Sequence, residues 1–292
     1  IKNRNTKTPK EVFEYLLKYK NILEKEPNDF EISNDNQNYI WQYWHQGKDN
    51  APRIVKTCLK SVEKYSENQT IKVLDKNDLY NYVELPSYII EKFEKGIIPY
   101  TQYSDIVRCA LLVKYGGTWI DSTVMLSNKI PDEIINSELF MFKTPALALS
   151  PKVPTLNFIE VFTKRFNFQN SYHCASSWFI HSKKDNILLK YVLTLLYEYW
   201  KNEDKLIDYF IFHYLMFLAI VCNKECAKEF EKMPSISNIA PHVLQGNLCK
   251  FFNQKEYDEI LKFSSIHKLT YKFKENKIKN NSYLYHLLEE LK

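Results

Sequence analysis

The sequence predicts an α/β fold, in which helices connect the strands of one central sheet and further helices are added around it. Residues 39–44 alternate and are rich in aromatics, as expected of a strand, and residues 70–74 form a second short β-type run. Between them, apolar residues recur at helical spacing after Pro52. This strand–helix–strand order predicts parallel strands joined by right-handed crossovers.

The remaining elements follow along the chain. Helical spacing predicts helices at 86–95, 102–115, 186–200, 207–223 and 283–291, and short apolar runs predict strands at 118–121, 139–142, 146–149 and 177–181. The helix at 102–115 should stop at Gly116 and Gly117, two of only five glycines in the chain, because glycine readily ends a helix with a left-handed residue. We expect a helical extension at 1–37, a main domain at 38–275 and a C-terminal helix at 276–292.

Composition narrows the class of protein. The chain has 292 residues, 45% of them hydrophobic, which is enough to bury a sizeable core. Its net charge of +5 is spread among interleaved Lys, Glu and Asp, a pattern typical of a solvated surface and not of a nucleic-acid-binding face. A weak attraction to an anionic membrane or a phosphorylated ligand is the alternative.

The location in the cell is predicted from cysteines and apolar runs. None of the six cysteines forms a CxxC pair, so we expect reduced thiols in a cytosolic protein. No signal peptide is recognisable. The longest apolar run, 209–222, is shorter than the roughly 20 residues of a membrane span. We therefore expect a cytoplasmic protein, with peripheral contact at the inner membrane face as a further option.

The segment 104–123 carries the densest chemistry. Asp105 and Arg108 lie three residues apart in a predicted helix and so share a face. On the surface such a pair would contribute little. In an otherwise apolar, buried helix, both charges need partners, which favours a ligand site.

Asp121 ends the predicted strand 118–121, and the carboxyl ends of strands are where ligands bind in open α/β sheets. Ser122 and Thr123 add oxygen atoms next to it, and such hard ligands suit Mg²⁺ or Mn²⁺. A simple turn cap is the alternative for a strand-terminal Asp. GxGxxG and Walker A sequences are absent, which argues against a dinucleotide fold or a P-loop.

Together these residues resemble a known signature. The pattern Ser104-Asp105-x-x-Arg108, followed by Gly116-Gly117-x-Trp119-Ile-Asp121, is similar to sugar-nucleotide-dependent glycosyltransferases with the GT-A (Rossmann-like) fold and a DxD-type motif. The likeness is greatest to bacterial capsular polysaccharide synthesis glycosyltransferases, relatives of yeast-type α-mannosyltransferases and glucosylating toxins. Segments 40–47 and 266–272 are also similar, so the resemblance spans about 38–273.

The resemblance implies the donor-binding and catalytic residues. Asp105 and Arg108 would hold the donor sugar and ribose, and Asp121 would contact ribose and metal. These three are the expected catalytic residues. The other expected donor contacts are Trp44 on uracil, Gln46 beside it, Ser122 in the motif and Lys268 on the diphosphate. Trp44 also has the alternative of an ordinary core aromatic.

A divalent cation, Mn²⁺ or Mg²⁺, is implied in the same way, with Asp121, Thr123 and His267 as ligands. Thr123 stands where many relatives have a second acid, and a hydroxyl is a far weaker ligand than a carboxylate. The metal would then be held loosely, would depend on the diphosphate and His267, or would be absent. A plain surface position is the alternative for His267.

Two segments are candidates for the acceptor side. Residues 171–179 are polar and aromatic, and Trp178 could stack on a sugar ring, although a loop and a buried strand fit equally well. Asp208 precedes an apolar helix, where an acid is most simply a cap. The resemblance raises it to a possible sugar or acceptor contact, and His213 is expected to be a core histidine.

The expected function is a retaining glycosyltransferase that moves a hexose from a nucleotide sugar, UDP-hexose first of all, to a lipid-linked or polysaccharide acceptor in surface polysaccharide synthesis. Front-face attack would give an α-linked product. A toxin-like transferase acting on protein and a non-catalytic sugar-nucleotide-binding module are the alternatives. The N-terminal extension would either dock to a membrane or partner or simply cap the fold.

Overall fold

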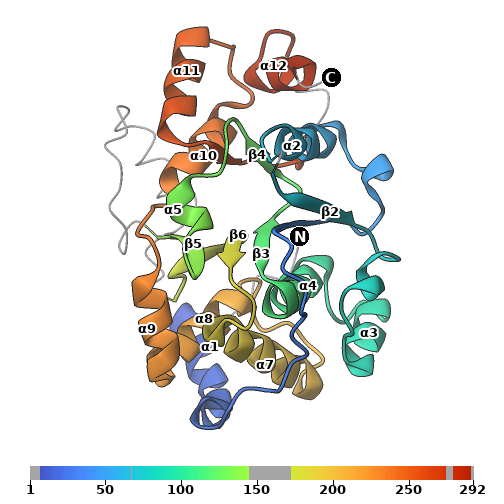
Figure 1. Ribbon diagram of the computed structural model, residues 1–292, viewed down its shortest axis with the longest axis vertical. Helices are drawn as coiled ribbons and strands as arrows, with labels where there is room; N and C mark the ends of the chain where they lie inside the picture. The colour runs from blue at the N-terminus through green and yellow to red at the C-terminus, as the bar shows by residue number, and fades with distance from the viewer. Residues whose placement is uncertain (1–6, 67, 145–171, 274–278, 291–292) are drawn as a thin grey trace.

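A five-stranded mixed sheet in the order β2-β1-β3-β6-β5 forms the centre of the computed structural model, which describes residues 7–66, 68–144, 172–273 and 279–290 (Figure 1). β1 (Tyr39–Tyr43) pairs in parallel with β2 (Thr70–Leu74) and with β3 (Gly117–Ile120). β6 (Ala175–Ser182) runs antiparallel to β3 and to β5 (Leu139–Lys143). The α/β prediction is confirmed, and its parallel crossovers hold for β1, β2 and β3.

The helices of the described ranges surround this sheet. They are α1 (Pro9–Leu16), α2 (Arg53–Lys64), α3 (Ser87–Glu94), α4 (Tyr100–Tyr115), α5 (Asp132–Ile135), α7 (Ile187–Asn202), α8 (Ile211–Cys222), α9 (Lys224–Lys232), α10 (Ile239–Asn247), α11 (Gln254–Phe263) and α12 (Tyr283–Glu290). Short 3₁₀ segments are Leu17–Glu24, Lys48–Asn50 and Leu79–Asn81. The predicted strand at 70–74 is present with the predicted ends, and the other predicted helices and strands are present with shifted ends. The predicted strand at 146–149 lies outside the described residues.

The helices form two layers. α1, α7 and α8 lie below the sheet in Figure 1, and α2, α10, α11 and α12 lie above it. Trp41 and Trp119 point from β1 and β3 into the lower core, together with side chains of α4, α7 and α8. Val12 and Leu16 of α1 belong to that same core, so the N-terminal extension packs into the main body. The domain boundaries at 37 and 275 stay predictions. None of the helices described here combines the length and the apolar character that a membrane span requires.

The predicted glycine stop fixes where β3 lies. Gly116 and Gly117 both have positive φ, +68° and +96°. A Cβ atom on Gly117 would lie 2.4 Å from the Tyr39 carbonyl oxygen, so only glycine allows β3 to approach β1 this closely. The indole Nε1 of Trp41 also donates to the Gly116 carbonyl at 2.9 Å. This turn delivers the end of β3 to the carboxyl edge of the sheet.

A second, two-stranded sheet continues from there. β4 (Val124–Leu126) pairs antiparallel with β7 (Ile266–Lys268), with Val124 opposite Lys268. The backbone N–H of Leu269 donates to the Thr123 carbonyl at 2.8 Å. Each strand has only three residues, too few for the periodicity that predicted the longer strands, and β4 was not expected from the sequence. The pairing brings the C-terminal part of the chain beside Asp121.

Candidate active site

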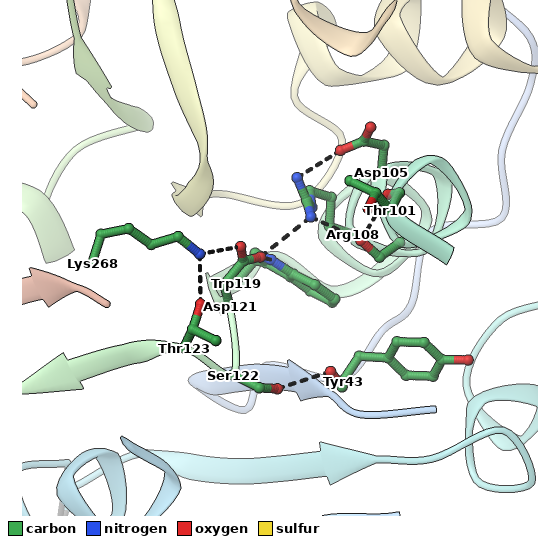
Figure 2. Close-up of polar contacts among 10 residues, drawn as sticks. Tyr43, Thr101, Asp105, Arg108, Trp119, Asp121, Ser122, Thr123 and Lys268 are labelled. Carbon is green, nitrogen blue, oxygen red and sulfur yellow. Dashed lines mark hydrogen bonds and ion pairs between the residues drawn. The ribbon is translucent and has the colours of Figure 1, made fainter. Parts of the chain in front are cut away.

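Asp121 is the centre of the site and accepts hydrogen bonds on both carboxylate oxygens (Figure 2). Its Oδ1 accepts from Arg108 Nη2 at 3.2 Å and from the Trp119 indole Nε1 at 2.9 Å. Its Oδ2 accepts from Lys268 Nζ at 2.8 Å. We call Asp105, Arg108, Asp121 and Lys268 the Asp121 cluster. Two cations thus fix the orientation of one carboxylate at the end of β3.

Arg108 joins the helix to the strand. Figure 2 shows its guanidinium between Asp105 and Asp121. Nη1 donates to Asp105 Oδ1 at 2.7 Å, and Nη2 donates also to the Ser104 hydroxyl at 3.0 Å. The Arg108 side chain is only 4% exposed, and its buried Nε has no hydrogen-bond partner among the described residues. Of the two readings of this pair, the buried one is therefore confirmed, and it leaves one donor unsatisfied.

The two carboxyl groups have different electrostatic surroundings. Burial by itself raises the pKa of Asp121, but the adjacent Lys268 and Arg108 outweigh burial and hold that pKa below its usual value. Burial raises the pKa of Asp105 to about 7. The positive charge of Arg108 opposes this shift, but the nearby negative charge of Asp121 raises the pKa of Asp105 further. Near neutral pH, Asp121 is ionised and Asp105 is poised to gain or lose a proton.

Lys268 lies on the other side of Asp121 and bridges it to Thr123. Its Nζ donates to Thr123 Oγ1 at 2.7 Å as well as to Asp121 at 2.8 Å, and its side chain is 18% exposed. The structure thus brings Lys268 into contact with Asp121 and Thr123 of the motif.

The residues at this point do not suit a divalent cation. The motif offers one carboxylate and two hydroxyls: Ser122 donates its hydroxyl to the Tyr43 carbonyl, and the ammonium of Lys268 already binds both Asp121 and Thr123. His267, the expected third ligand, is fully buried, and burial lowers its pKa to about 3. Its Nε2 lies 2.9 Å from the Ser127 hydroxyl, and side chains alternate along a strand, so it faces away from Lys268 and Asp121. In the described part of the chain, no three His, Cys, Asp or Glu residues gather as a metal site would need.

The other expected donor contacts are placed differently. Trp44 follows β1, is half-buried, and lies edge-on to Tyr271 with ring centroids 5.5 Å apart. Its buried Nε1 has no partner among the described residues. Gln46 is exposed in the turn after β1. Ser122 donates its hydroxyl to the Tyr43 carbonyl at 2.8 Å, so in this structure it ties β3 to β1.

The acceptor-side candidates sit around the same edge. Trp178 in β6 is buried and stacks on Phe142, while its carbonyl accepts from the backbone N–H of Asp121 at 2.9 Å. Asp208 accepts from the backbone N–H of Phe210 at 2.8 Å in the turn before α8. The helix begins at Ile211 and not at 207, and its N-cap is Phe210, so Asp208 is not the cap that the sequence suggested. Burial lowers the pKa of His213 well below its usual value, as expected of a core histidine.

Two contributors were not assigned a role from sequence. Trp119 supplies the indole donor to Asp121, and its ring lies 5.2 Å from the guanidinium carbon of Arg108. Ser104 supports Arg108 from one helical turn away. The sequence shows how far Trp119 and Ser104 are from Asp121 and Arg108 along the segment 104–123, but it does not show which way their side chains point.

The amino-acid sequence was compared with known protein families and with curated proteins. The family model described as "Capsular polysaccharide synthesis protein" matches residues 1–287. The "O-glycosyltransferase PaGT" of Phomopsis amygdali is 33% identical over 107 residues, which are 34% of this chain and 26% of that protein. The "O-glycosyltransferase braB" of Annulohypoxylon truncatum is 31% identical over 103 residues, 32% of this chain and 24% of that protein. The matched stretch thus spans about a quarter of each of these curated relatives.

Solved structures were compared in the same way. The "PaToxG Glycosyltransferase" aligns over 87% of this chain and 91% of its own, with a TM-score of 0.40 and 12% identity. The "WbbM bifunctional glycosytransferase apo structure" aligns over 90% of this chain and 53% of its own, with a TM-score of 0.39 and 10% identity.

Proposed function

The chain belongs to the capsular polysaccharide synthesis protein family, and from this premise we propose that it is a glycosyltransferase that moves a hexose from a UDP-sugar to a glycan acceptor with retention of anomeric configuration. The observation that carries the proposal is the Asp121 cluster. It places one buried cation, one half-buried cation and two carboxyl groups at the carboxyl edge of the parallel strands, where ligands bind in such sheets.

The charges of the cluster match those of the reaction. As the bond between the anomeric carbon and the diphosphate breaks, negative charge grows on the diphosphate. Lys268 and Arg108 supply preorganised positive charge for it, and Arg108 Nε is a donor still without a partner among the described residues. Positive charge grows on the sugar ring, and the carboxylates of Asp105 and Asp121 stabilise it. Each member of the cluster therefore has a role in the transition state.

Retention is proposed to occur by front-face attack. The acceptor oxygen forms its bond to the anomeric carbon on the side from which UDP leaves, and the acceptor proton passes to the departing diphosphate oxygen. Asp105 and Asp121 are both bound to Arg108, which lowers their reactivity as nucleophiles and disfavours a covalent sugar–enzyme intermediate. The acceptor, in keeping with the family, is a lipid-linked or polysaccharide chain, and its product linkage is α.

The donor is identified by a thermal-shift screen over nucleotide sugars. A ligand that binds the native state raises the unfolding temperature by mass action, so a UDP-hexose should produce the largest shift. NMR of the product with a capsular repeat-unit acceptor then reports the anomeric configuration. A β-linked product from a UDP-α-hexose would overturn retention, and no shift with any nucleotide sugar would overturn the proposed activity.

A further inference from the structure

Lys268 occupies the place between Asp121 and Thr123 where the sequence motif would hold a metal. Its ammonium donates to Asp121 Oδ2 at 2.8 Å and to Thr123 Oγ1 at 2.7 Å (Figure 2). An ammonium group has three N–H donors, so one remains after these two bonds. The described residues provide no acceptor for it.

The backbone holds Lys268 in this position. Antiparallel pairing places Lys268 opposite Val124, and the next residue, Leu269, donates its backbone N–H to the Thr123 carbonyl at 2.8 Å. The side chain is 18% exposed, so the ammonium is largely removed from water while it still reaches solvent or a ligand. Lys268 is therefore held in the site by the backbone and is not a mobile surface side chain.

Charge also favours the lysine over a metal. The Asp121 cluster contains two cations and two carboxyl groups, and because Asp105 is only partly ionised near neutral pH, its positive charge already equals or exceeds its negative charge. A divalent ion at the same point would meet the ammonium of Lys268 and the guanidinium of Arg108 at close range, with a single carboxylate as its anionic ligand. Because Thr123 is neutral, the carboxylate of Asp121 supplies a single negative charge. That charge matches the one positive charge of the ammonium and not the two of a divalent cation.

We infer that Lys268 replaces the divalent cation: it stays bound to Asp121 and Thr123 and donates its third N–H to the diphosphate, so that donor binding and sugar transfer need no metal. The inference rests on the proposed function, because the diphosphate belongs to the proposed donor. It explains in one step why Thr123 stands where an acid is common and why His267 faces away from the site.

The first test uses the unmodified protein. UDP and UDP-hexose binding is measured by isothermal titration calorimetry in a chelator and again with Mn²⁺, and Mn²⁺ binding to the protein, with and without UDP, is measured by electron paramagnetic resonance. We expect donor affinity and turnover to agree within about twofold in the two buffers, and no saturable Mn²⁺ site. Loss of binding in the chelator with recovery in Mn²⁺ would overturn the inference.

A matched pair of variants tests the lysine itself. Lys268→Met should weaken UDP binding in the chelator by at least about tenfold, because it removes a charged hydrogen bond to the diphosphate, and Mn²⁺ should not restore it. Lys272→Met removes the same charge from an exposed position on the same segment and should leave binding unchanged. Equal affinities of the Lys268 and Lys272 variants would contradict the inference.

The double variant Thr123→Asp with Lys268→Ala restores a second acid and removes the ammonium. It should gain a saturable Mn²⁺ site in the resonance titration, a readout independent of activity. Its natural comparison is Thr123→Asp alone, in which Lys268 should still exclude Mn²⁺. A saturable Mn²⁺ site already present in the unmodified protein, and lost in Asp121→Asn, would overturn the inference.

The two proposals fail in different ways. If no nucleotide sugar binds in either buffer, the proposed function is wrong, and the Mn²⁺ titration still decides whether the site excludes a metal. If UDP-hexose binds only with Mn²⁺, the proposed function stands and the role of Lys268 is wrong.

Discussion

Two acidic centres of this protein have similar partners but different surroundings. At Asp121, Arg108, Trp119 and Lys268 donate to a carboxylate. At Glu203, the donors are Tyr15 at 2.7 Å, Tyr19 at 3.1 Å and Lys18. We call these last four residues the Glu203 cluster.

The difference lies in what each cluster leaves unsatisfied. The Glu203 cluster joins the N-terminal segment to the end of α7, Lys18 is 44% exposed, and one oxygen receives all three donors. The Asp121 cluster is more buried around Arg108, contains a second acid, and leaves Arg108 Nε without a partner among the described residues. The Glu203 cluster is therefore a structural contact between two segments of the chain. In the Asp121 cluster, the Arg108 donor left unpaired within the described ranges and the raised pKa of Asp105 indicate a ligand site.

The largest effect should come from removing Asp121. Asp121→Ala leaves Arg108 and Lys268 without the carboxylate that orients them, so kcat/KM should fall by at least about 10³-fold, the upper range for loss of one preorganised electrostatic group. Circular dichroism and thermal unfolding should show a retained fold, since Arg108 keeps its bond to Asp105. Turnover is measured by UDP release.

Asp258→Ala, which removes an exposed acid in α11, is the matched control and should leave turnover unchanged. Asp121→Asn keeps the shape of the side chain and serves if the alanine variant unfolds. Unchanged turnover in both Asp121 variants would show that the Asp121 cluster, like the Glu203 cluster, has only a structural role.

A smaller effect should follow the protonation of Asp105. Its pKa is raised to about 7, so the native state holds this proton more tightly than the unfolded chain does. Relative to Asp105→Asn, the free energy of unfolding should therefore decrease as pH rises from about 4 to 7 and level off above that range. Chemical denaturation at several pH values measures this difference.

The same titration should appear in ligand binding. Ionised Asp105 offsets the positive charge that Arg108 offers to the diphosphate, so UDP-hexose affinity should fall by up to about tenfold between pH 6 and 8, following the fraction ionised. In Asp105→Asn this step should be missing. A wild-type affinity that is flat over this range would contradict a coupling between the titration of Asp105 and donor binding.

The smallest effect is expected at Glu203. Glu203→Gln should lower the free energy of unfolding by about 1 kcal/mol, because it weakens charge-assisted bonds to Lys18 and the tyrosines, and it should leave turnover unchanged. Burial raises the pKa of Glu203, but bonds to Lys18, Tyr15 and Tyr19 outweigh it and lower the pKa. The contribution of Glu203 is therefore present above pH 4.5 and disappears as pH falls through its lowered pKa.

Glu14→Gln, at an exposed i,i+4 pair in α1, is the control and should change stability by less than about 0.5 kcal/mol. Denaturant unfolding at pH 7 and pH 4 compares the two variants. A loss of turnover in Glu203→Gln with normal stability would mean that the Glu203 cluster is more than a structural contact.

Local patterns predicted much of the fold. The strand at 70–74 has the predicted ends, and α4 ends at Gly116 as the glycine pair indicated. The motif at 104–123 also predicted the family, and the match over residues 1–287 confirms it. These features depend on neighbouring residues, whose spacing the sequence shows directly.

Other elements depended on distant partners. β4 and β7 have three residues each and exist because they pair with one another. The antiparallel position of β6 between β3 and β5 carries no signature in its apolar run. The metal ligand expected at His267 rested on spacing, which cannot show the phase of a strand: a shift of one residue turns each side chain to the other face.

Local spacing was enough to show that Asp105 and Arg108 share a helix face, that two glycines end that helix, and that Asp121 follows at a strand end. Those relations come from helical periodicity and backbone freedom over a few residues. Contacts between distant parts of the chain were needed to show that Lys268, 145 residues beyond Thr123, binds Thr123 and Asp121, and that His267 faces Ser127. The pairing of β4 with β7 made that choice, because strand register selects which of two adjacent side chains faces the site.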